Sequence, residues 1–149
     1  MADEITVGII DDDASIRETL TDFIEGRGYA AEVFSSGEEL FGFLYDGGVV
    51  NIVLVDLMLP GMSGIELLQK LQDEFYHIEV IFVTGHATVD TAIEAIRKGA
   101  RSYLEKPINI KRLEAELESA ASVSRIYQDN ILLSKKLKEK KGFARILGS

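Results

Sequence analysis

Acidic side chains and one lysine follow apolar segments that have the length of β-strands. Asp11, Asp12 and Asp13 come directly after one such segment. Asp56 ends a longer apolar segment, and Lys106 follows a third, shorter one. In an open α/β sheet the parallel strands end at one edge, where ligands bind in a crevice. We therefore expect these groups to converge at that edge. They would form a small site for a hard cation, with a spare carboxylate that could receive a phosphoryl group.

The acidic groups predict a magnesium site. Asp11 and Asp12 are neighbours and point to different sides, so one can contact a metal directly and the other through water. Closely packed carboxylates repel each other when ionised, which favours a bound divalent cation. Ligands that are all oxygen indicate Mg²⁺ rather than Zn²⁺. The alternative is that residues 11–13 form only a turn and a helix cap. An EF-hand is excluded, because Ile16 stands where that calcium-binding loop requires glycine.

Three residues are candidates for handling the phosphoryl group. An acid at the end of an apolar central strand is costly unless it is paired or metal-bound, so Asp56 is the predicted nucleophile. Thr84 ends the next apolar segment, and its hydroxyl could bind a phosphoryl oxygen, although a lone threonine there is often just a strand end. Lys106 supplies a compact positive charge. The Lys106–Pro107 peptide is a candidate for the cis form, which would turn the lysine inward.

Apolar strand-like segments alternate with amphipathic helical ones along the chain. The expected strands are residues 5–10, 30–34, 49–55, 79–84 and 101–105. The expected helices are residues 14–27, a second one that opens at 35–39 and ends at Gly47, and then 65–75 and 88–98. Connections of this length require parallel pairing, so the pattern predicts a doubly wound α/β sheet of five strands.

A fifth helix is expected to begin near Asn109 and to stop at Gly142. It would be roughly 48 Å long at about 1.5 Å per residue, which is longer than the domain needs. Its second part has apolar or amide residues at heptad spacing: Val123, Ile126, Asn130, Leu133 and Leu137. This spacing favours a parallel two-chain coiled coil whose register the asparagine specifies. The alternative is a lone amphipathic helix that packs on its own domain.

Composition and charge set limits on the function. The chain has 149 residues and no cysteine, which excludes disulfides, thiolate zinc sites and a cysteine nucleophile. The first residues lack the pattern of a signal peptide and the apolar runs are too short to span a membrane, so we expect a soluble cytoplasmic protein.

The charge is unevenly distributed along the chain. Residues 1–108 hold 20 acidic and 7 basic residues, whereas residues 109–149 hold 5 acidic and 9 basic residues. The acidic part should not bind nucleic acid, and the basic run at 135–141 is interpreted as a solvated helix face.

Four motifs resemble those of the response-regulator receiver domain of two-component signalling. They are Ile9-Ile10-Asp11-Asp12-Asp13 with Arg17, Val55-Asp56-Leu57-Met58-Leu59-Pro60-Gly61-Met62-Ser63-Gly64, Val83-Thr84-Gly85-His86, and Tyr103-Leu104-Glu105-Lys106-Pro107. The likeness covers about residues 4–120, and the motifs stand in the family's order and spacing. It implies a flavodoxin-like sheet with the strand order 2-1-3-4-5.

The same resemblance implies how the acidic site would be used. Asp56 would be phosphorylated by a sensor histidine kinase in a Mg²⁺-dependent reaction. The Mg²⁺ would be held by Asp12, Asp56 and the backbone carbonyl of Met58, and Asp11 would help through water.

The resemblance also implies a switch. Thr84 and Lys106 would contact the phosphoryl group, and Tyr103 would be the aromatic side chain that turns inward when Thr84 moves. We expect this to bias a face formed by the fourth helix, the fifth strand and the base of the fifth helix. Because the fifth helix continues into the expected coiled coil, a shift at its base would change how two chains pair.

A second resemblance concerns residues 142–149, Gly-Phe-Ala-Arg-Ile-Leu-Gly-Ser. They are similar to the opening of the ATPase domain in NtrC-type activators of sigma-54 RNA polymerase. The expected division is therefore a receiver at residues 1–120, a helical coiled-coil linker at 121–141 and the start of a truncated ATPase domain at 142–149. No Walker motif is present, so contacts with polymerase and DNA would need domains absent from this sequence. The alternative is a stand-alone CheY-like receiver that acts through protein–protein contacts.

Three other classes of protein compete with this interpretation. A haloacid-dehalogenase-like phosphatase also uses an aspartate nucleophile with Mg²⁺, but it needs a second acid two residues later, where this chain has Met58. A nucleotide-binding module is disfavoured because neither glycine-rich phosphate motif is present. A purely structural binding domain with degenerate acids stays open, and binding of beryllofluoride with Mg²⁺ would separate it from an active receiver.

Overall fold

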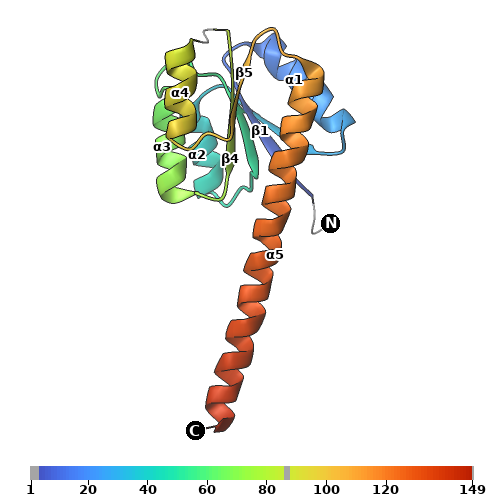
Figure 1. Ribbon diagram of the computed structural model, residues 1–149, viewed down its shortest axis with the longest axis vertical. Helices are drawn as coiled ribbons and strands as arrows, with labels where there is room; N and C mark the ends of the chain where they lie inside the picture. Colours follow the sequence, from blue (N-terminus) through green and yellow to red (C-terminus); the bar gives the residue numbers. More distant parts are fainter. Residues whose placement is uncertain (1–3, 86–87, 149) are drawn as a thin grey trace.

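Five strands and five helices alternate along residues 4–85 and 88–148, which the computed structural model describes, with side chains described up to Leu133 (Figure 1). The strands are β1 (Thr6–Ile10), β2 (Ala30–Phe34), β3 (Ile52–Val55), β4 (Glu79–Thr84) and β5 (Ser102–Glu105). The helices are α1 (Ala14–Gly26), α2 (Gly37–Tyr45), α3 (Gly64–Glu74), α4 (Val89–Arg97) and α5 (Ile110–Gly148).

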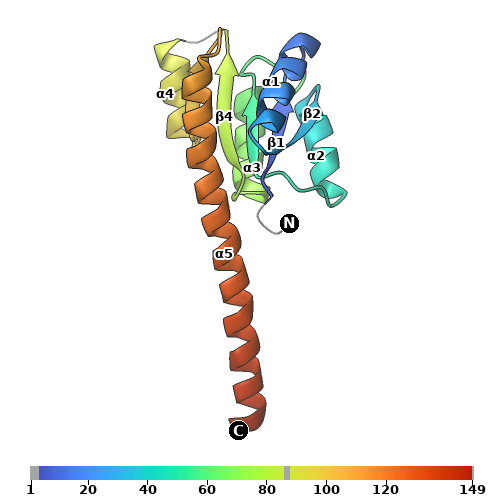
Figure 2. The same cartoon turned by 90° about the vertical axis from the view of Figure 1, so that its right-hand side faces the viewer.

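The strands form one parallel sheet in the order β2-β1-β3-β4-β5. This confirms the predicted flavodoxin-like, doubly wound topology, in which ligands bind where the strand order reverses next to β1. Helices α2, α3 and α4 pack on one face of the sheet, and α1 and α5 pack on the other (Figure 2). Both faces of β3 are therefore covered, which is why all four of its residues are buried and apolar.

Polar side chains mark where the helices begin. Asp13 accepts a hydrogen bond from the backbone N–H of Ser15 and caps α1, as its residue type predicts. Ser36 and Ser63 cap α2 and α3 in the same way, and Thr88 forms a reciprocal capping box with Thr91 at the start of α4. Because α1 and α3 begin directly after the loops that carry the acids, these caps hold both loops in place.

The central strand is shorter than its sequence predicts. We expect a strand over residues 49–55, but β3 begins at Ile52. Val49 lies 64% exposed, so its apolar character does not place it in the core. The buried side chain of Asn51 accepts a hydrogen bond from the backbone N–H of Thr6 at 2.8 Å. An asparagine inside an apolar run thus closes the amino end of the β1–β3 pair.

Helix α5 has two parts with different surroundings. The apolar spacing predicts that Ile110, Leu113, Leu117, Ala120 and Ala121 dock on the sheet, and the structure buries all of them except Ile110, which is 45% exposed because it stands at the first residue of the helix. Ser124 is still buried, and the ring of Tyr127 still stacks on the ring of His77 at 5.0 Å; past these residues the helix extends away from the domain (Figures 1 and 2). The predicted stop at Gly142 is wrong, because the helix continues to Gly148. A single glycine weakens a helix by about 1 kcal/mol but does not by itself end it.

In the described part of the chain, none of the helices combines the length and the apolar character that crossing a membrane would require. The outer part of α5 is instead strongly charged, with a basic run at residues 135–141.

Replacing Asn51 with Ala tests its role at the start of β3. The substitution leaves the backbone N–H of Thr6 without its acceptor in a partly buried position, so we expect the free energy of unfolding to fall by about 1–3 kcal/mol. Urea denaturation measures this difference. The control is Val49→Ala at a nearby exposed position, where a change within about 0.5 kcal/mol is expected. Equal effects of the two substitutions would contradict this role.

Candidate functional site

The predicted convergence of acids and lysine is confirmed at the carboxyl ends of the strands. The ammonium group of Lys106 donates hydrogen bonds to Asp11 Oδ2 at 2.9 Å and to Asp56 Oδ2 at 3.0 Å. Asp11 and Asp56 are buried, with 3% and 7% of their surface exposed. The Lys106–Pro107 peptide is cis, as its sequence suggests. One ammonium group therefore joins the ends of β1, β3 and β5.

Each buried carboxylate is also held by the backbone of its own loop. Asp11 Oδ1 accepts a hydrogen bond from the N–H of Asp13 at 2.9 Å, and Asp56 Oδ1 accepts one from the N–H of Met58 at 3.0 Å. In both residues one oxygen faces the loop and the other faces Lys106. This arrangement fixes the rotamers of two like charges that would otherwise move apart.

The carboxylates of Asp11, Asp12 and Asp56 can hold a metal ion. One oxygen from each lies within 4.8 Å of the others, and Asp12 is exposed to solvent beside the two buried acids. Three carboxylates and one ammonium leave an excess of two negative charges, which a divalent cation would neutralise. Because this cluster offers only oxygen, its chemistry fits Mg²⁺, as the sequence predicts.

Lys106 stays protonated in this environment. Burial removes water from the ammonium group and lowers its pKa, but the hydrogen bonds and charges of Asp11 and Asp56 act in the opposite direction. The net effect raises the pKa of Lys106 above its ordinary value. The lysine is therefore a permanent cation at neutral pH and can stabilise negative charge that develops on a bound oxyanion.

Thr84 occupies the position between the acids and the last strand. It is fully buried at the end of β4, and its backbone carbonyl accepts a hydrogen bond from the N–H of Lys106 at 2.9 Å. The chain thus brings Thr84 next to the lysine that contacts Asp56, as its place in the sequence predicts. His86, which belongs to the same motif, lies outside the described residues.

Tyr103 connects this region to α4. Its ring packs 6.4 Å from the ring of Phe82, and its hydroxyl lies 3.2 Å from the hydroxyl of Thr91. Tyr103 also lines a cavity of about 360 Å³ with residues of α4 and α5, among them Arg112. The contact with Thr91 is not predicted from the sequence, since a threonine in the first turn of a helix usually signals only a cap.

Gly64 is a further residue that the sequence reasoning did not assign. A Cβ atom at this position would lie 2.8 Å from the ring of Phe82, 2.9 Å from Leu57 Cα and 3.0 Å from the carbonyl oxygen of Asp56. Glycine therefore allows α3 to begin against the loop that carries Asp56. The signals in the sequence are its place at the end of the second motif and directly after a helix-capping serine, Ser63.

The linker residues lie apart from the acidic site. Val123, Ile126 and Leu133 are 39%, 59% and 57% exposed, and Asn130 is exposed as well. The side chain of Leu137 lies outside the described side chains. An exposed apolar stripe on a helix that leaves its own domain is the surface that a coiled coil requires, and the pairing itself stays a prediction.

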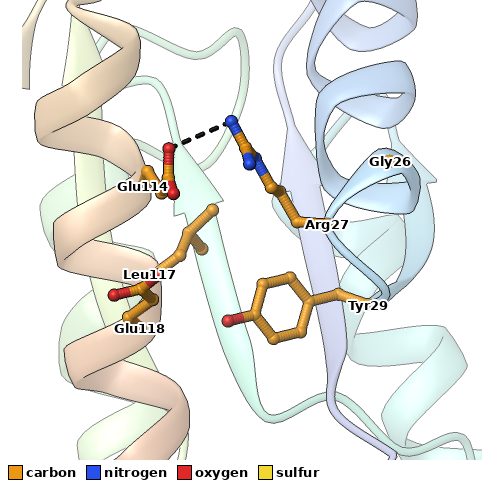
Figure 3. A pocket seen from close by; sticks show the side chains of 6 residues that line it. All are labelled: Gly26, Arg27, Tyr29, Glu114, Leu117 and Glu118. Atoms are coloured by element: carbon orange, nitrogen blue, oxygen red, sulfur yellow. Dashed lines mark ion pairs between the residues drawn. The ribbon is translucent and has the colours of Figure 1, made fainter.

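A separate cavity of about 300 Å³ lies between the end of α1 and α5 (Figure 3). Arg27 and Glu114 form an ion pair across it at 3.0 Å, and Tyr29 and Leu117 line its inner side (Figure 3). Since Arg27 and Glu114 are both partly exposed, this pair contributes less than about 1 kcal/mol. The cavity lies at the far end of α1 from the capping residue Asp13, so the acidic site does not include it.

The raised pKa of Lys106 predicts a pH-dependent contribution to stability. The folded pKa lies above the unfolded value of about 10.4, so the contribution is fully present at about pH 8 and is lost as the pH rises through the folded pKa. At about pH 8 we expect Lys106→Met to lower the free energy of unfolding by about 2 kcal/mol. Urea denaturation without Mg²⁺ should show a smaller difference from wild type at about pH 11.

The control for this experiment is Lys98→Met, which removes a surface ammonium that pairs with Glu94 at 3.1 Å. Its effect should stay below about 1 kcal/mol at both pH values. A difference between wild type and Lys106→Met that persists undiminished at high pH would show that the ammonium charge is not what stabilises the site.

Comparison with known proteins places the chain in a family. The family model described as "Response regulator receiver domain" matches residues 7–118. The transcriptional regulatory protein FixJ of Bradyrhizobium diazoefficiens is 35% identical over 112 residues, which are 75% of this chain and 54% of that protein. A putative NtrX-like response regulator of Rickettsia bellii is 31% identical over 138 residues, 91% of this chain and 29% of that protein. The DNA-binding transcriptional regulator NtrC of Salmonella typhimurium is 34% identical over 116 residues, 78% of this chain and 24% of that protein.

Solved structures agree with this assignment. The chain is similar to a response regulator receiver domain protein from Clostridium thermocellum, with a TM-score of 0.76 and 28% identity over 83% of this chain and 98% of that one. It is also similar to the structure of FixJ-N, with a TM-score of 0.72 and 34% identity over 80% of this chain and 94% of that one. The chain spans only about half, or less, of the curated relatives named above. It belongs to the response regulator receiver domains, the signalling domains of two-component systems.

Proposed function

We propose that this chain accepts a phosphoryl group on Asp56 from a sensor histidine kinase, in a reaction that depends on Mg²⁺. The observation that carries the proposal is the position of the Asp56 carboxylate. It is buried at the carboxyl edge of the sheet, bonded to Lys106, and within 4.8 Å of oxygens of Asp11 and Asp12. A nucleophile, a fixed cation and a set of metal ligands thus lie together.

The chemistry is a transfer between two nucleophiles. A carboxylate oxygen of Asp56 attacks phosphorus while the bond between phosphorus and the histidine nitrogen of the kinase breaks, and the imidazole leaves with the electron pair. Lys106 is already directed at this carboxylate and can neutralise charge on the phosphoryl oxygens. Asp12, Asp56 and the backbone carbonyl of Met58 would hold the Mg²⁺, with Asp11 assisting through water. The bound cation would supply charge neutralisation on the same oxygens.

The oxygens of the new phosphoaspartate need more hydrogen-bond donors than the free carboxylate does. Thr84 is buried beside Lys106 and can offer its hydroxyl to a phosphoryl oxygen by moving toward it. Tyr103 would then turn inward and give up its contact with the hydroxyl of Thr91 on α4. Since Arg112 of α5 also donates to the carbonyl of Tyr103 at 3.4 Å, this change would reach the base of α5. The α4–β5–α5 face is thus the two-state element that phosphorylation biases.

The output of the switch is proposed to be a change in how two chains pair. α4 presents Val89, Ile93 and Ile96 to solvent, with 75%, 49% and 48% of their surface exposed. The linker stripe of Val123, Ile126, Asn130, Leu133 and Leu137 follows along α5. A homodimer through these residues would transmit the change beyond the receiver.

The whole protein is proposed to be an activator of sigma-54 RNA polymerase. Its ATPase domain would begin at residues 142–149, and its contacts with polymerase and DNA would lie in domains beyond this chain. The proposal is supported by similarity to NtrC and NtrX-like regulators, which this chain matches over only 24–29% of their length. The long α5 helix provides the connection that such an arrangement needs.

Asp56→Asn tests the proposed acceptor. After treatment with acetyl phosphate and Mg²⁺, intact-mass spectrometry should show one added phosphoryl group on the wild type and none on the variant, because the amide is a poor nucleophile. The control Asp13→Asn changes a nearby exposed acid that only caps α1, and it should still be phosphorylated. Phosphorylation of the Asp56 variant to the wild-type extent, or a response of its oligomeric state to the phosphoryl donor, would refute the assignment.

Leu133→Asp tests the proposed linker. A charge at a core position of a coiled coil disrupts the pairing, so we expect analytical ultracentrifugation to show at least a tenfold loss of dimer affinity. The control is Leu132→Asp, since Leu132 is 53% exposed but lies one residue off the stripe. If both variants behave alike, or if the wild type is a monomer with and without phosphorylation, the stripe is not the dimer contact.

A further inference from the structure

Arg17 belongs to the first motif of the sequence, and none of the roles derived above involves it. It lies in the second turn of α1 and is partly buried. Its guanidinium Nη1 donates a hydrogen bond to the backbone carbonyl of Asp11 at 2.6 Å. Its backbone N–H donates to the carbonyl of Asp13 at 3.1 Å. Arg17 therefore reaches back over the loop that carries the acidic residues.

The bond to the Asp11 carbonyl has a particular consequence. This carbonyl and the N–H of Asp12 belong to one planar peptide unit. Fixing the carbonyl oxygen therefore also fixes the backbone from which the side chain of Asp12 projects. Asp11 is held by three other contacts, from its N–H to the Phe34 carbonyl and from its carboxylate to Asp13 and Lys106. Asp12 is exposed, and its direction depends on the peptide unit before it.

Arg17 also lies near Glu39 in the first turn of α2. Glu39 accepts a hydrogen bond from the N–H of Ser35 at 2.6 Å. The pKa of Glu39 is lowered mainly by this backbone bond, then by the Ser35 side chain, and to a smaller extent by the charge of Arg17. The guanidinium thus also lies near an acid of the first turn of α2, which is itself bonded to the backbone of Ser35.

We infer that Arg17 is a positioning residue for the divalent-cation site. It holds the peptide between Asp11 and Asp12 so that both carboxylates face Asp56. The inference rests on the proposed function of the acidic cluster. Residues that hold metal ligands from behind typically change metal affinity by about 10- to 100-fold. The positioning contact of Arg17 would strengthen Mg²⁺ binding, although the positive charge of Arg17 by itself weakens it.

This opposition in sign separates the two roles that Arg17 could have. A positive charge close to the site repels Mg²⁺, so removing the charge alone should strengthen Mg²⁺ binding. Removing a positioning contact should weaken it. Arg17→Met removes both the charge and the contact, so a rise in the Kd for Mg²⁺ requires that the positioning contact outweighs the repulsion, whereas loss of repulsion alone would lower the Kd.

The experiment is calorimetric titration of MgCl₂ into the full chain. We expect Arg17→Met to raise the Kd for Mg²⁺ about tenfold and Arg17→Lys, which keeps a donor and the charge, to raise it less. The matched control is Arg27→Met, which removes the same charge at the C-cap of α1, where it is paired with Glu114, and its Kd should stay within about twofold of wild type. A Kd for Arg17→Met that is unchanged, or lower than wild type, overturns the inference.

A second readout does not depend on the metal. In ¹⁵N-labelled protein without Mg²⁺, Arg17→Met should shift the amide resonance of Asp12, while urea denaturation confirms that the variant is folded. If Arg17→Met does not fold, Arg17→Lys carries both tests, and unchanged Kd and Asp12 resonance in that variant overturn the inference. Failure of the wild type itself to bind Mg²⁺ would instead refute the proposed function of the site, so the two failures are distinguishable.

Discussion

The structure depends on one ammonium group held between two buried carboxylates. Lys106 lies 2.9 Å from Asp11 and 3.0 Å from Asp56, and it joins residues that are 95 and 50 positions away in the chain. Without a cation, these two buried carboxylates would repel each other. The lysine makes their charged forms compatible, and the exposed Asp12 adds the third carboxylate that turns the pair into a site for a divalent ion.

The sheet order is what allows this contact. β1 lies beside β3, so the ends of these strands place Asp11 and Asp56 next to each other. β4 lies between β3 and β5, and the backbone bond from Lys106 to Thr84 brings the lysine back toward the acids. Gly64 contributes from the other side, because a larger residue would press α3 against the carbonyl of Asp56. The site is therefore assembled by the ends of four strands and by the start of one helix.

The same residues that hold the site face different neighbours. Thr84 ends β4, whose residues 80–84 are all buried, and Lys106 directly follows β5, whereas Tyr103 contacts Thr91 and lines a cavity with Arg112 of α5. α5 then carries the chain from the sheet to an exposed apolar stripe that begins at Val123. Arg17 has a comparable place on the opposite side of the site, where it holds the acid loop and lies near Glu39. The charged groups of the acidic site are thus linked by side-chain and backbone contacts to helices on both faces of the sheet.

Local patterns in the sequence determined the element types, the strand order through the family motifs, and the identity of the acids and lysine that converge. These are properties of residue periodicity and of parallel strands, which must end at one edge. The extent of β3, the course of α5 past Gly142, the contact of Tyr103 with Thr91 and the bond from Arg17 to Asp11 were decided only by the tertiary structure. Each of these depends on which backbone group or side chain lies opposite in space. Asn51 shows the reason: its amide could end a strand or continue it, and the hydrogen bond that it accepts from the N–H of Thr6 on the neighbouring strand selects the first.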